Sequence, residues 1–117
     1  MIDRLIGDSQ PGRSAGSGYK DLVCCVATAT NESLDLTGQT TEALENLDKS
    51  LGQLDSDKTR LISAQVFIAN IDDKAIMDSV WNPWIGNDPK HWPQRSCLGV
   101  NLGGNWLIEI VVTAARN

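Results

Sequence analysis

The sequence is poor in the residues that most often build catalytic and metal sites. Histidine occurs once, at His91, so a multi-histidine metal site is impossible and a Ser-His-Asp triad would depend on that residue alone. The three cysteines are an odd number, and adjacent Cys24 and Cys25 fit neither a disulfide framework nor a zinc motif. On a strand this pair would point to opposite faces and pack as small apolar residues. We expect no metal and no cofactor.

Long apolar runs and basic runs are also missing. No apolar stretch approaches the roughly 20 residues that a membrane span requires, and the first ten residues lack the layout of a signal peptide. The net charge is -5 with a pI near 4.6, and the 10 lysines and arginines are scattered. Because binding to phosphate needs a basic face, a nucleic-acid partner is not expected. We expect a soluble, cytoplasmic protein without a membrane partner.

The remaining pattern is that of one α+β domain. The 117 residues, 41% of them hydrophobic, suffice for one modest core, so a single domain is predicted over residues 1–117. Gly, Ser and Pro predict a loop over residues 7–18. Apolar periodicity then predicts a buried strand over 22–29, a helix over 40–54, a strand over 59–68 and a helix over 75–84. In the last helix, Ala75, Ile76, Val80 and both tryptophans should form the apolar side.

The end of the chain is predicted to be a hairpin. Gly103-Gly104-Asn105 is a turn signal between an extended segment over 95–102 and another over 106–113. This pairing would bring Arg95 and Glu109 to one end of a sheet.

These elements predict a two-layer sandwich in which two helices cover one face of a mixed sheet of four to six strands. Segments such as LVCCVATA and LIEIVVTA are too apolar for a sheet face in contact with water. The second face should therefore be buried against other subunits.

Arg95 is the best candidate for binding a ligand, because a guanidinium can hold a carboxylate through two hydrogen bonds. A structural ion pair at the edge of the strand explains Arg95 equally well. Glu109 lies among apolar residues, where an unpaired charge is costly, so it either polarises a ligand or forms a salt bridge, with Arg95 or across an interface. Cys97 should share the face of Arg95 and line the same pocket, although no base stands beside it to activate a thiolate.

The order and spacing of several motifs resemble the Rid family of reactive-intermediate (imine) deaminases, also called RidA/YjgF-like proteins or endoribonuclease L-PSP. The motifs are Pro93-x-Arg95-Ser96-Cys97, Ile108-Glu109-Ile110 with a terminal Thr-Ala-Ala, the strand SAQVFI and the Trp-x-x-Trp of the second helix. The resemblance spans roughly residue 21 to the C-terminus. It implies a chorismate-mutase-like α+β fold and a homotrimer whose sheets form a central barrel, with sites in clefts between subunits.

The resemblance also implies a chemistry and roles for individual residues. Arg95 would hold the carboxylate of a 2-imino acid, the unstable product of pyridoxal-phosphate enzymes, and Glu109 would activate the water that attacks the imine carbon. Cys97 would line the cleft. Val26-Ala27 stand where the family has a small pair whose backbone contacts ligand, and Asp78 stands where it often has asparagine, so these three residues also belong to the predicted substrate site.

Three functions follow from this sequence. The first is hydrolytic deamination of 2-imino acids to 2-keto acids and ammonia. The second, favoured by Val26-Ala27 and Asp78, is a trimer of the same fold that binds a small carboxylate or another anion without chemistry. The third, ribonuclease activity, agrees poorly with a net charge of -5 and a lone histidine.

Overall fold

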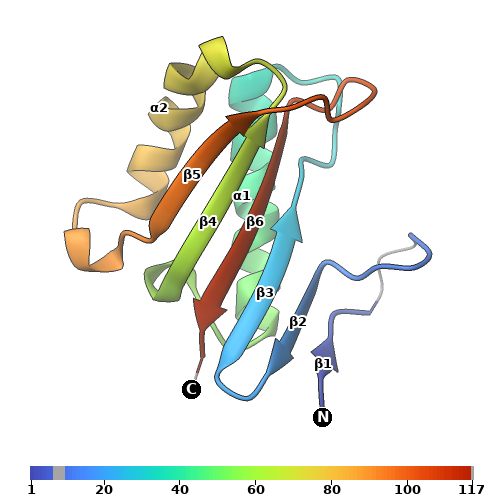
Figure 1. Ribbon diagram of the computed structural model, residues 1–117, viewed down its shortest axis with the longest axis vertical. Helices are drawn as coiled ribbons and strands as arrows, with labels where there is room; N and C mark the ends of the chain where they lie inside the picture. Colours follow the sequence, from blue (N-terminus) through green and yellow to red (C-terminus); the bar gives the residue numbers. More distant parts are fainter. Residues whose placement is uncertain (7–9, 117) are drawn as a thin grey trace.

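The computed structural model of the protein describes residues 1–6 and 10–116, which form one mixed sheet with two α-helices on one of its faces (Figure 1). The six strands lie in the order β1-β2-β3-β6-β4-β5. All neighbours are antiparallel except β4 and β5, which are parallel. This arrangement confirms the predicted α+β class, with both helices on one side of a mixed sheet.

The N-terminal part of the sheet is built from three strands, β1 (Asp3–Arg4), β2 (Gly16–Tyr19) and β3 (Leu22–Ala27). The predicted loop over 7–18 includes residues 7–9, which lie outside the described residues, and its last three residues already belong to β2. A two-residue turn at Lys20 and Asp21 joins β2 to β3. Along β3, Cys25 is buried and Cys24 is exposed, which confirms that the two cysteines lie on opposite faces.

Helix α1 (Leu36–Gln53) carries the predicted apolar stripe, and all its members are buried, namely Ala43, Leu44, Leu47, Leu51 and, just after the helix, Leu54. The helix begins four residues before the predicted start at Thr40. Asp35 is the N-cap, and its carboxylate accepts a hydrogen bond from the Gly38 N–H at 2.9 Å. The first turn was missed because it contains Gln39, which is polar and yet fully buried.

Strand β4 (Leu61–Ile68) contains a β-bulge that changes the predicted alternation. Its pairing with β6 shifts between Leu61 and Ser63, so Ile62 is the extra residue. As a result Leu61 is buried and Ile62 is 48% exposed, the reverse of what a regular strand would give. From Ala64 onward the predicted pattern holds.

Helix α2 (Lys74–Ile85) buries Met77, Trp81 and Ile85 against the sheet and α1. The predicted apolar side was partly wrong, because Ile76 is 42% exposed. Pro83 lies inside the last turn, and the helix ends two residues later before Gly86, whose positive φ of 86° suits glycine.

The predicted C-terminal hairpin is wrong. Strand β5 (Gln94–Gly99) pairs only with β4, whereas β6 (Ile108–Ala115) lies between β3 and β4. Helix α2 connects β4 to β5 as a β-α-β crossover, which makes these two strands parallel neighbours and leaves β4 between β5 and β6. The loop over 100–107 crosses the end of β4, where the Val100 N–H donates to the Ile68 carbonyl.

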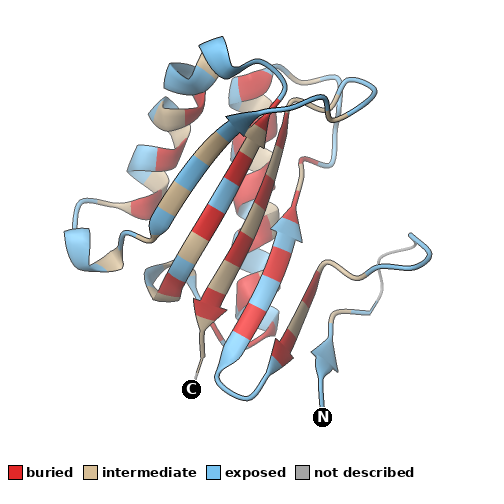
Figure 2. Cartoon of the chain, viewed as in Figure 1, coloured by how far each residue is buried: buried red, intermediate tan, exposed pale blue. Residues whose placement is uncertain are grey.

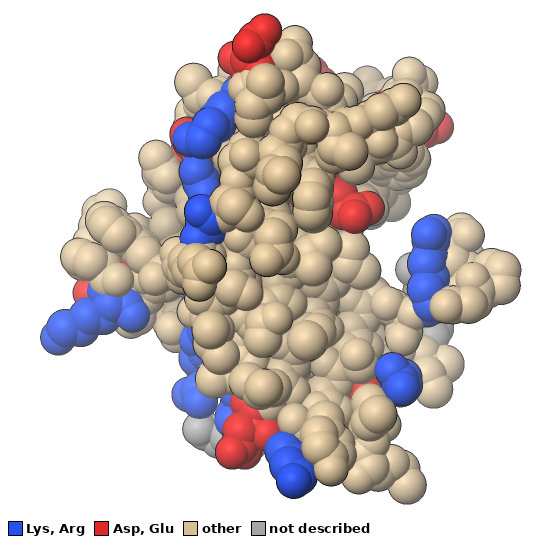
Figure 3. Space-filling model, in the orientation of Figure 1, with Lys and Arg blue, Asp and Glu red and all other residues tan. Residues whose placement is uncertain are grey.

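The sheet face that points away from the helices, called the open face below, faces the viewer in Figure 1. Buried and more exposed residues alternate along β3 and β6, because only every second side chain points toward the helices (Figure 2). Uncharged side chains dominate the middle of the open face, and charged ones lie mostly along its margins (Figure 3). Exposed Leu22, Val26 and Leu98 contribute to this apolar surface.

Candidate functional site

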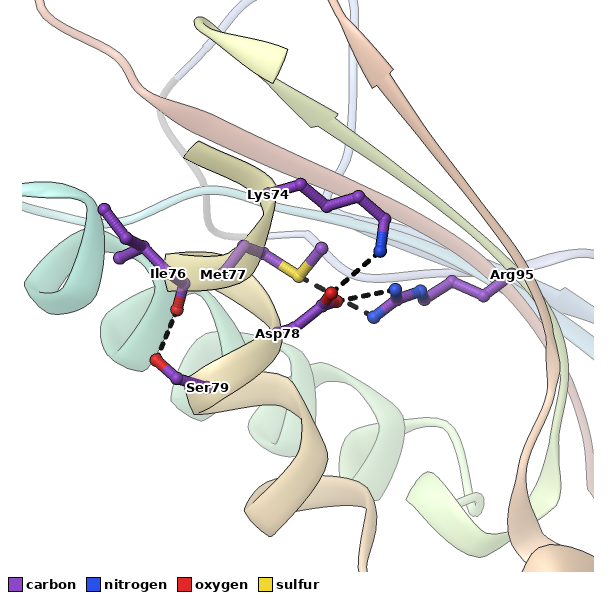
Figure 4. Close-up of polar contacts among 6 residues, drawn as sticks. All are labelled: Lys74, Ile76, Met77, Asp78, Ser79 and Arg95. Carbon is purple, nitrogen blue, oxygen red and sulfur yellow. Dashed lines mark hydrogen bonds and ion pairs between the residues drawn. The ribbon is translucent and has the colours of Figure 1, made fainter. Parts of the chain in front are cut away.

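Arg95 lies near the start of the edge strand β5 and points toward α2 (Figure 4). Its Nη2 donates a hydrogen bond to Asp78 Oδ1 at 2.7 Å, and its Nη1 lies 3.8 Å from the Met77 sulfur. The Arg95 Cζ stacks 5.3 Å from the centre of the Trp81 ring. The side chain is 19% exposed, so α2 holds the guanidinium in one orientation while part of it still reaches solvent.

Asp78 connects Arg95 to a second cation. Its other carboxylate oxygen accepts a hydrogen bond from Lys74 Nζ at 2.8 Å. Partial burial by itself raises the pKa of Asp78, but hydrogen bonds from Lys74 and Arg95 and their positive charges outweigh it, so the pKa is lowered. Asp78 is therefore ionised at neutral pH, and the three side chains together keep one positive charge in excess.

A cavity of about 420 Å³ opens beside Arg95. Its lining comes from the end of α2, from the loop that follows and from β5: Trp81, Asn82, Ile85, Gly86, Asn87, Trp92, Pro93 and Arg95. This volume falls in the range of small-molecule pockets, roughly 300–1,000 Å³. A carboxylate that enters the cavity would meet Arg95 on its wall.

Cys97 lies on the same face of β5 as Arg95, as predicted, but it packs against the core and is not part of the lining of that cavity. Burial raises the pKa of the Cys97 thiol, an effect that the charges of Arg95 and Lys74 only partly oppose. The thiol is therefore protonated at neutral pH. This agrees with the expectation that Cys97 is not an activated nucleophile.

Glu109 lies on β6 and faces the other way, onto the open face. It lines two adjoining cavities of about 280 and 320 Å³, together with Arg13 and Thr28. Val26 lines the second of these cavities and is 37% exposed, so its side chain leaves space beside Glu109. Arg13 was not among the predicted site residues, although the resemblance to the Rid family places a tyrosine of other members at Arg13 or Ser14.

Ala27, the other member of the predicted small pair, is 5% exposed and points toward the helices. It lines a cavity of about 510 Å³ between the ends of β3 and α1, where Asn46 and Lys49 supply polar groups. The Asn46 amide donates to the Thr28 carbonyl at 2.9 Å, which ties α1 to the end of β3. The side chains of Val26 and Ala27 point to opposite faces of the sheet, although Val26 also lines this cavity.

Arg95 and Glu109 do not meet within one chain. On their common neighbour β4, Arg95 is level with Ala64 and Glu109 is level with Phe67. Ala64 points toward the helices and Phe67 points toward the open face, so the cation and the carboxylate lie on opposite faces of the sheet. The ion pair between them that the sequence left open is not formed within the chain, where Arg95 pairs with Asp78 instead.

The described residues contain neither a metal-binding cluster nor a membrane-spanning helix. Residues 1–6 and 10–116 contain no cluster of three or more His, Cys, Asp or Glu side chains that could hold a metal ion. No helix in this part of the chain is long and apolar enough to cross a membrane.

A sequence model of the family described as "Endoribonuclease L-PSP" matches residues 24–116. The chain belongs to this family. The matched region contains the candidate site residues Val26, Ala27, Asp78, Arg95, Cys97 and Glu109. Arg13 lies before it. Membership in the endoribonuclease L-PSP family confirms the resemblance to Rid and YjgF proteins that the motifs around Arg95 and Glu109 indicated.

Relatives of known sequence and structure support this assignment. A RutC family protein from Haemophilus ducreyi is 38% identical over 75% of this chain and 74% of its own length. The crystal structure of an uncharacterized protein from Pseudomonas aeruginosa superimposes with a TM-score of 0.87 at 28% identity and covers 100% of both chains. A member of the YjgF protein family from Neisseria meningitidis also gives a TM-score of 0.87, at 25% identity, over 100% of this chain and 96% of its own.

Proposed function

We propose that this member of the endoribonuclease L-PSP family hydrolyses reactive 2-imino acids to 2-keto acids and ammonia, in clefts between the subunits of a homotrimer. The observation that carries the proposal is the orientation and partial exposure of the Arg95 side chain. Its guanidinium is oriented by Asp78 and Trp81, remains partly exposed and forms part of a cavity wall. A guanidinium fixed in this way is suited to hold the carboxylate of a small acid.

The charges around Arg95 support a substrate with a single carboxylate. Lys74 and Arg95 contribute two positive charges and Asp78 one negative charge. One added carboxylate neutralises this set, and partial burial strengthens the attraction compared with bulk water.

Glu109 supplies the base in the proposed reaction. The oxygen of a water molecule bonds to the imine carbon while one of its protons passes to the Glu109 carboxylate, and the electron pair of the C=N bond moves to the nitrogen. The proton then passes to that nitrogen, which gives a carbinolamine. The Glu109 carboxylate next takes the hydroxyl proton of this intermediate and passes it to the amine nitrogen, so that the C–N bond breaks and ammonia leaves as the C=O bond forms. The overall change is imine plus water to ketone plus ammonia, and it needs no oxidant, reductant or cofactor.

The positions of the two groups support a site between subunits. Arg95 lies on the helix side of β5, an edge strand whose outer edge has no neighbour among the described strands, and Glu109 lies on the open face. A single substrate can contact both only when Glu109 comes from a second copy of the chain. The apolar open face gives that second copy a surface on which to pack.

The test couples the purified protein to a threonine dehydratase and follows the formation of 2-ketobutyrate. The wild type should accelerate its release over buffer, and Arg95→Ala should lower kcat/KM roughly 10- to 100-fold, because a charge-assisted hydrogen bond to the substrate is lost. Arg4→Ala, which removes an exposed arginine on β1, is the matched control and should keep full activity. No acceleration by the wild type, or equal rates for wild type and Arg95→Ala, would refute the proposal.

One observation favours the alternative of a trimer that binds an anion without turnover. Asp78 already occupies one edge of the Arg95 guanidinium at 2.7 Å, so a ligand carboxylate must bind beside a like charge. This alternative predicts a rise in melting temperature with pyruvate or 2-ketobutyrate that is lost in Arg95→Ala, while no imine is consumed. The coupled assay and the melting experiment together separate the two functions.

A further inference from the structure

The cavity beside Arg95 has an aromatic character that a clamp for a carboxylate does not require. Two indole rings, of Trp81 and Trp92, line it together with Ile85 and Pro93. Such rings provide large apolar contact areas, and aromatic pairs gain roughly 0.5–1.5 kcal/mol beyond the area they bury. The cavity therefore offers a second kind of interaction next to the cation.

The two indoles are held differently. Trp81 is 4% exposed, packs against Trp84 with ring centres 5.2 Å apart, and belongs to the core. Trp92 is 53% exposed, although its Nε1 donates a hydrogen bond to the Gly86 carbonyl at 2.9 Å. That bond fixes one edge of the ring while its faces are not covered by the core. An exposed and tethered indole can stack on a ligand at little cost in side-chain entropy.

We infer that this cavity receives the side chain of the substrate and that the preferred substrates are 2-imino acids with aromatic side chains. The inference rests on the proposed function and deepens it. In a 2-imino acid the carboxylate carbon is bonded directly to the imine carbon, which also carries the side chain. A carboxylate held by Arg95 therefore places the side chain within reach of Trp81 and Trp92. A methyl group would leave most of the roughly 420 Å³ unfilled.

The experiment generates imines from phenylalanine, tryptophan and alanine with an amino-acid oxidase, in the presence of catalase to remove peroxide, and measures their disappearance. The wild type should show a kcat/KM for the two aromatic imines at least about tenfold above that for the alanine imine. Trp92→Ala should remove most of that preference, so that the ratio of kcat/KM for the aromatic imines to that for the alanine imine falls toward one. Trp92→Phe should keep most of the preference, since it keeps an aromatic wall. Ile76→Ala, which truncates an exposed apolar residue on α2 away from the open face, should change none of the three rates.

The outcomes separate this inference from the proposed function. If the alanine imine is hydrolysed as fast as the aromatic ones, or if Trp92→Ala slows all three equally, the inference is wrong and the deaminase proposal stands. If no imine is hydrolysed, the deaminase proposal fails. Calorimetry with phenylpyruvate and pyruvate then still decides what the cavity binds, because binding needs no turnover. Wild type should bind phenylpyruvate roughly tenfold more tightly than pyruvate and Trp92→Ala should not, whereas equal affinities would overturn the inference.

Discussion

Asp78 accepts hydrogen bonds from Lys74 and Arg95, and its ionised form is the one that α2 and β5 stabilise. The sequence presented Asp78 as a departure that adds negative charge to a site for anions. In the structure it also orients the guanidinium, because it fixes Nη2 while the Trp81 ring lies against Cζ. Replacing it should therefore have an effect on stability that depends on pH.

We predict that the wild type is more stable than Asp78→Asn at neutral pH and that this difference disappears in acid. The pKa of Asp78 is lowered in the folded protein, so its carboxylate contributes stability above the ordinary pKa of an aspartate and loses it as pH falls through the lowered value. The difference in unfolding free energy should be constant between about pH 5 and 8 and shrink below about pH 4. Urea unfolding of both proteins at each pH measures it. A difference that stays the same from pH 7 to pH 3 would contradict this account.

At the scale of elements, the start of α1 and the loop that leads into β6 are joined by one buried amide. Gln39 is fully buried, and its Nε2 lies within hydrogen-bond distance of the carbonyls of Glu32, Leu34 and Asn105 at 3.2, 3.0 and 2.9 Å. Its Oε1 accepts a hydrogen bond from the Leu107 N–H at 2.9 Å. This amide fixes the backbone two residues before Glu109.

We predict that Gln39→Leu lowers the free energy of unfolding by about 3 kcal/mol, because it leaves a buried N–H and several carbonyls without partners. The replacement has a similar size and is apolar, so a loss of volume does not explain the effect. Gln53→Leu, at the exposed end of the same helix, should change stability by less than about 0.5 kcal/mol. Denaturant titrations of the two variants beside wild type measure both values, and equal stabilities would show that the Gln39 network contributes little.

The positions of the helices and strands were largely predictable from the sequence, but which strands pair with one another was less so. Apolar spacing identified α1, and every residue of its apolar stripe is buried in the structure. The bulge at Ile62 could not be predicted in this way, because it depends on the pairing of β4 with β6 and does not change the apolar pattern of β4. The turn at Gly103 and Gly104 exists, with both φ angles positive, but it belongs to a crossing loop. The helix between β4 and β5 was the available signal that these strands are parallel neighbours.

In the candidate site, too, individual residues were predictable from the sequence, but the contacts between them were not. Arg95 and its place on a strand followed from the sequence, whereas its pairing with Asp78 depends on how α2 packs on β5. The separation of Arg95 and Glu109 onto opposite faces followed from strand order, which local patterns do not determine. The hydrogen bond from Trp92 to the Gly86 carbonyl could not be predicted, because it closes a short loop that apolar periodicity does not describe.

For the whole molecule, the feature that bears on assembly is the open face of the sheet. Val111 lies in its middle, on the central strand β6, between Val26 on β3 and Gln65 on β4. A surface of this kind in the centre of a sheet is suited to packing against further copies. If Glu109 acts on a substrate that Arg95 of another copy holds, assembly and activity depend on the same face.

We predict that wild type has a solution mass three times the 12.7 kDa of the chain and that Val111→Lys dissociates it, because a charge would be buried at the interface. Ile76→Lys is the matched control, since Ile76 is exposed on α2, away from the open face, and its replacement should leave the mass unchanged. Light scattering after size exclusion gives the masses, and circular dichroism confirms that both variants are folded. Dissociated Val111→Lys should also lose imine hydrolysis, because each chain alone holds Arg95 and Glu109 on opposite faces of its sheet. A monomeric wild type would contradict the trimer, and a dissociated variant that keeps full activity would show that the site is complete within one chain.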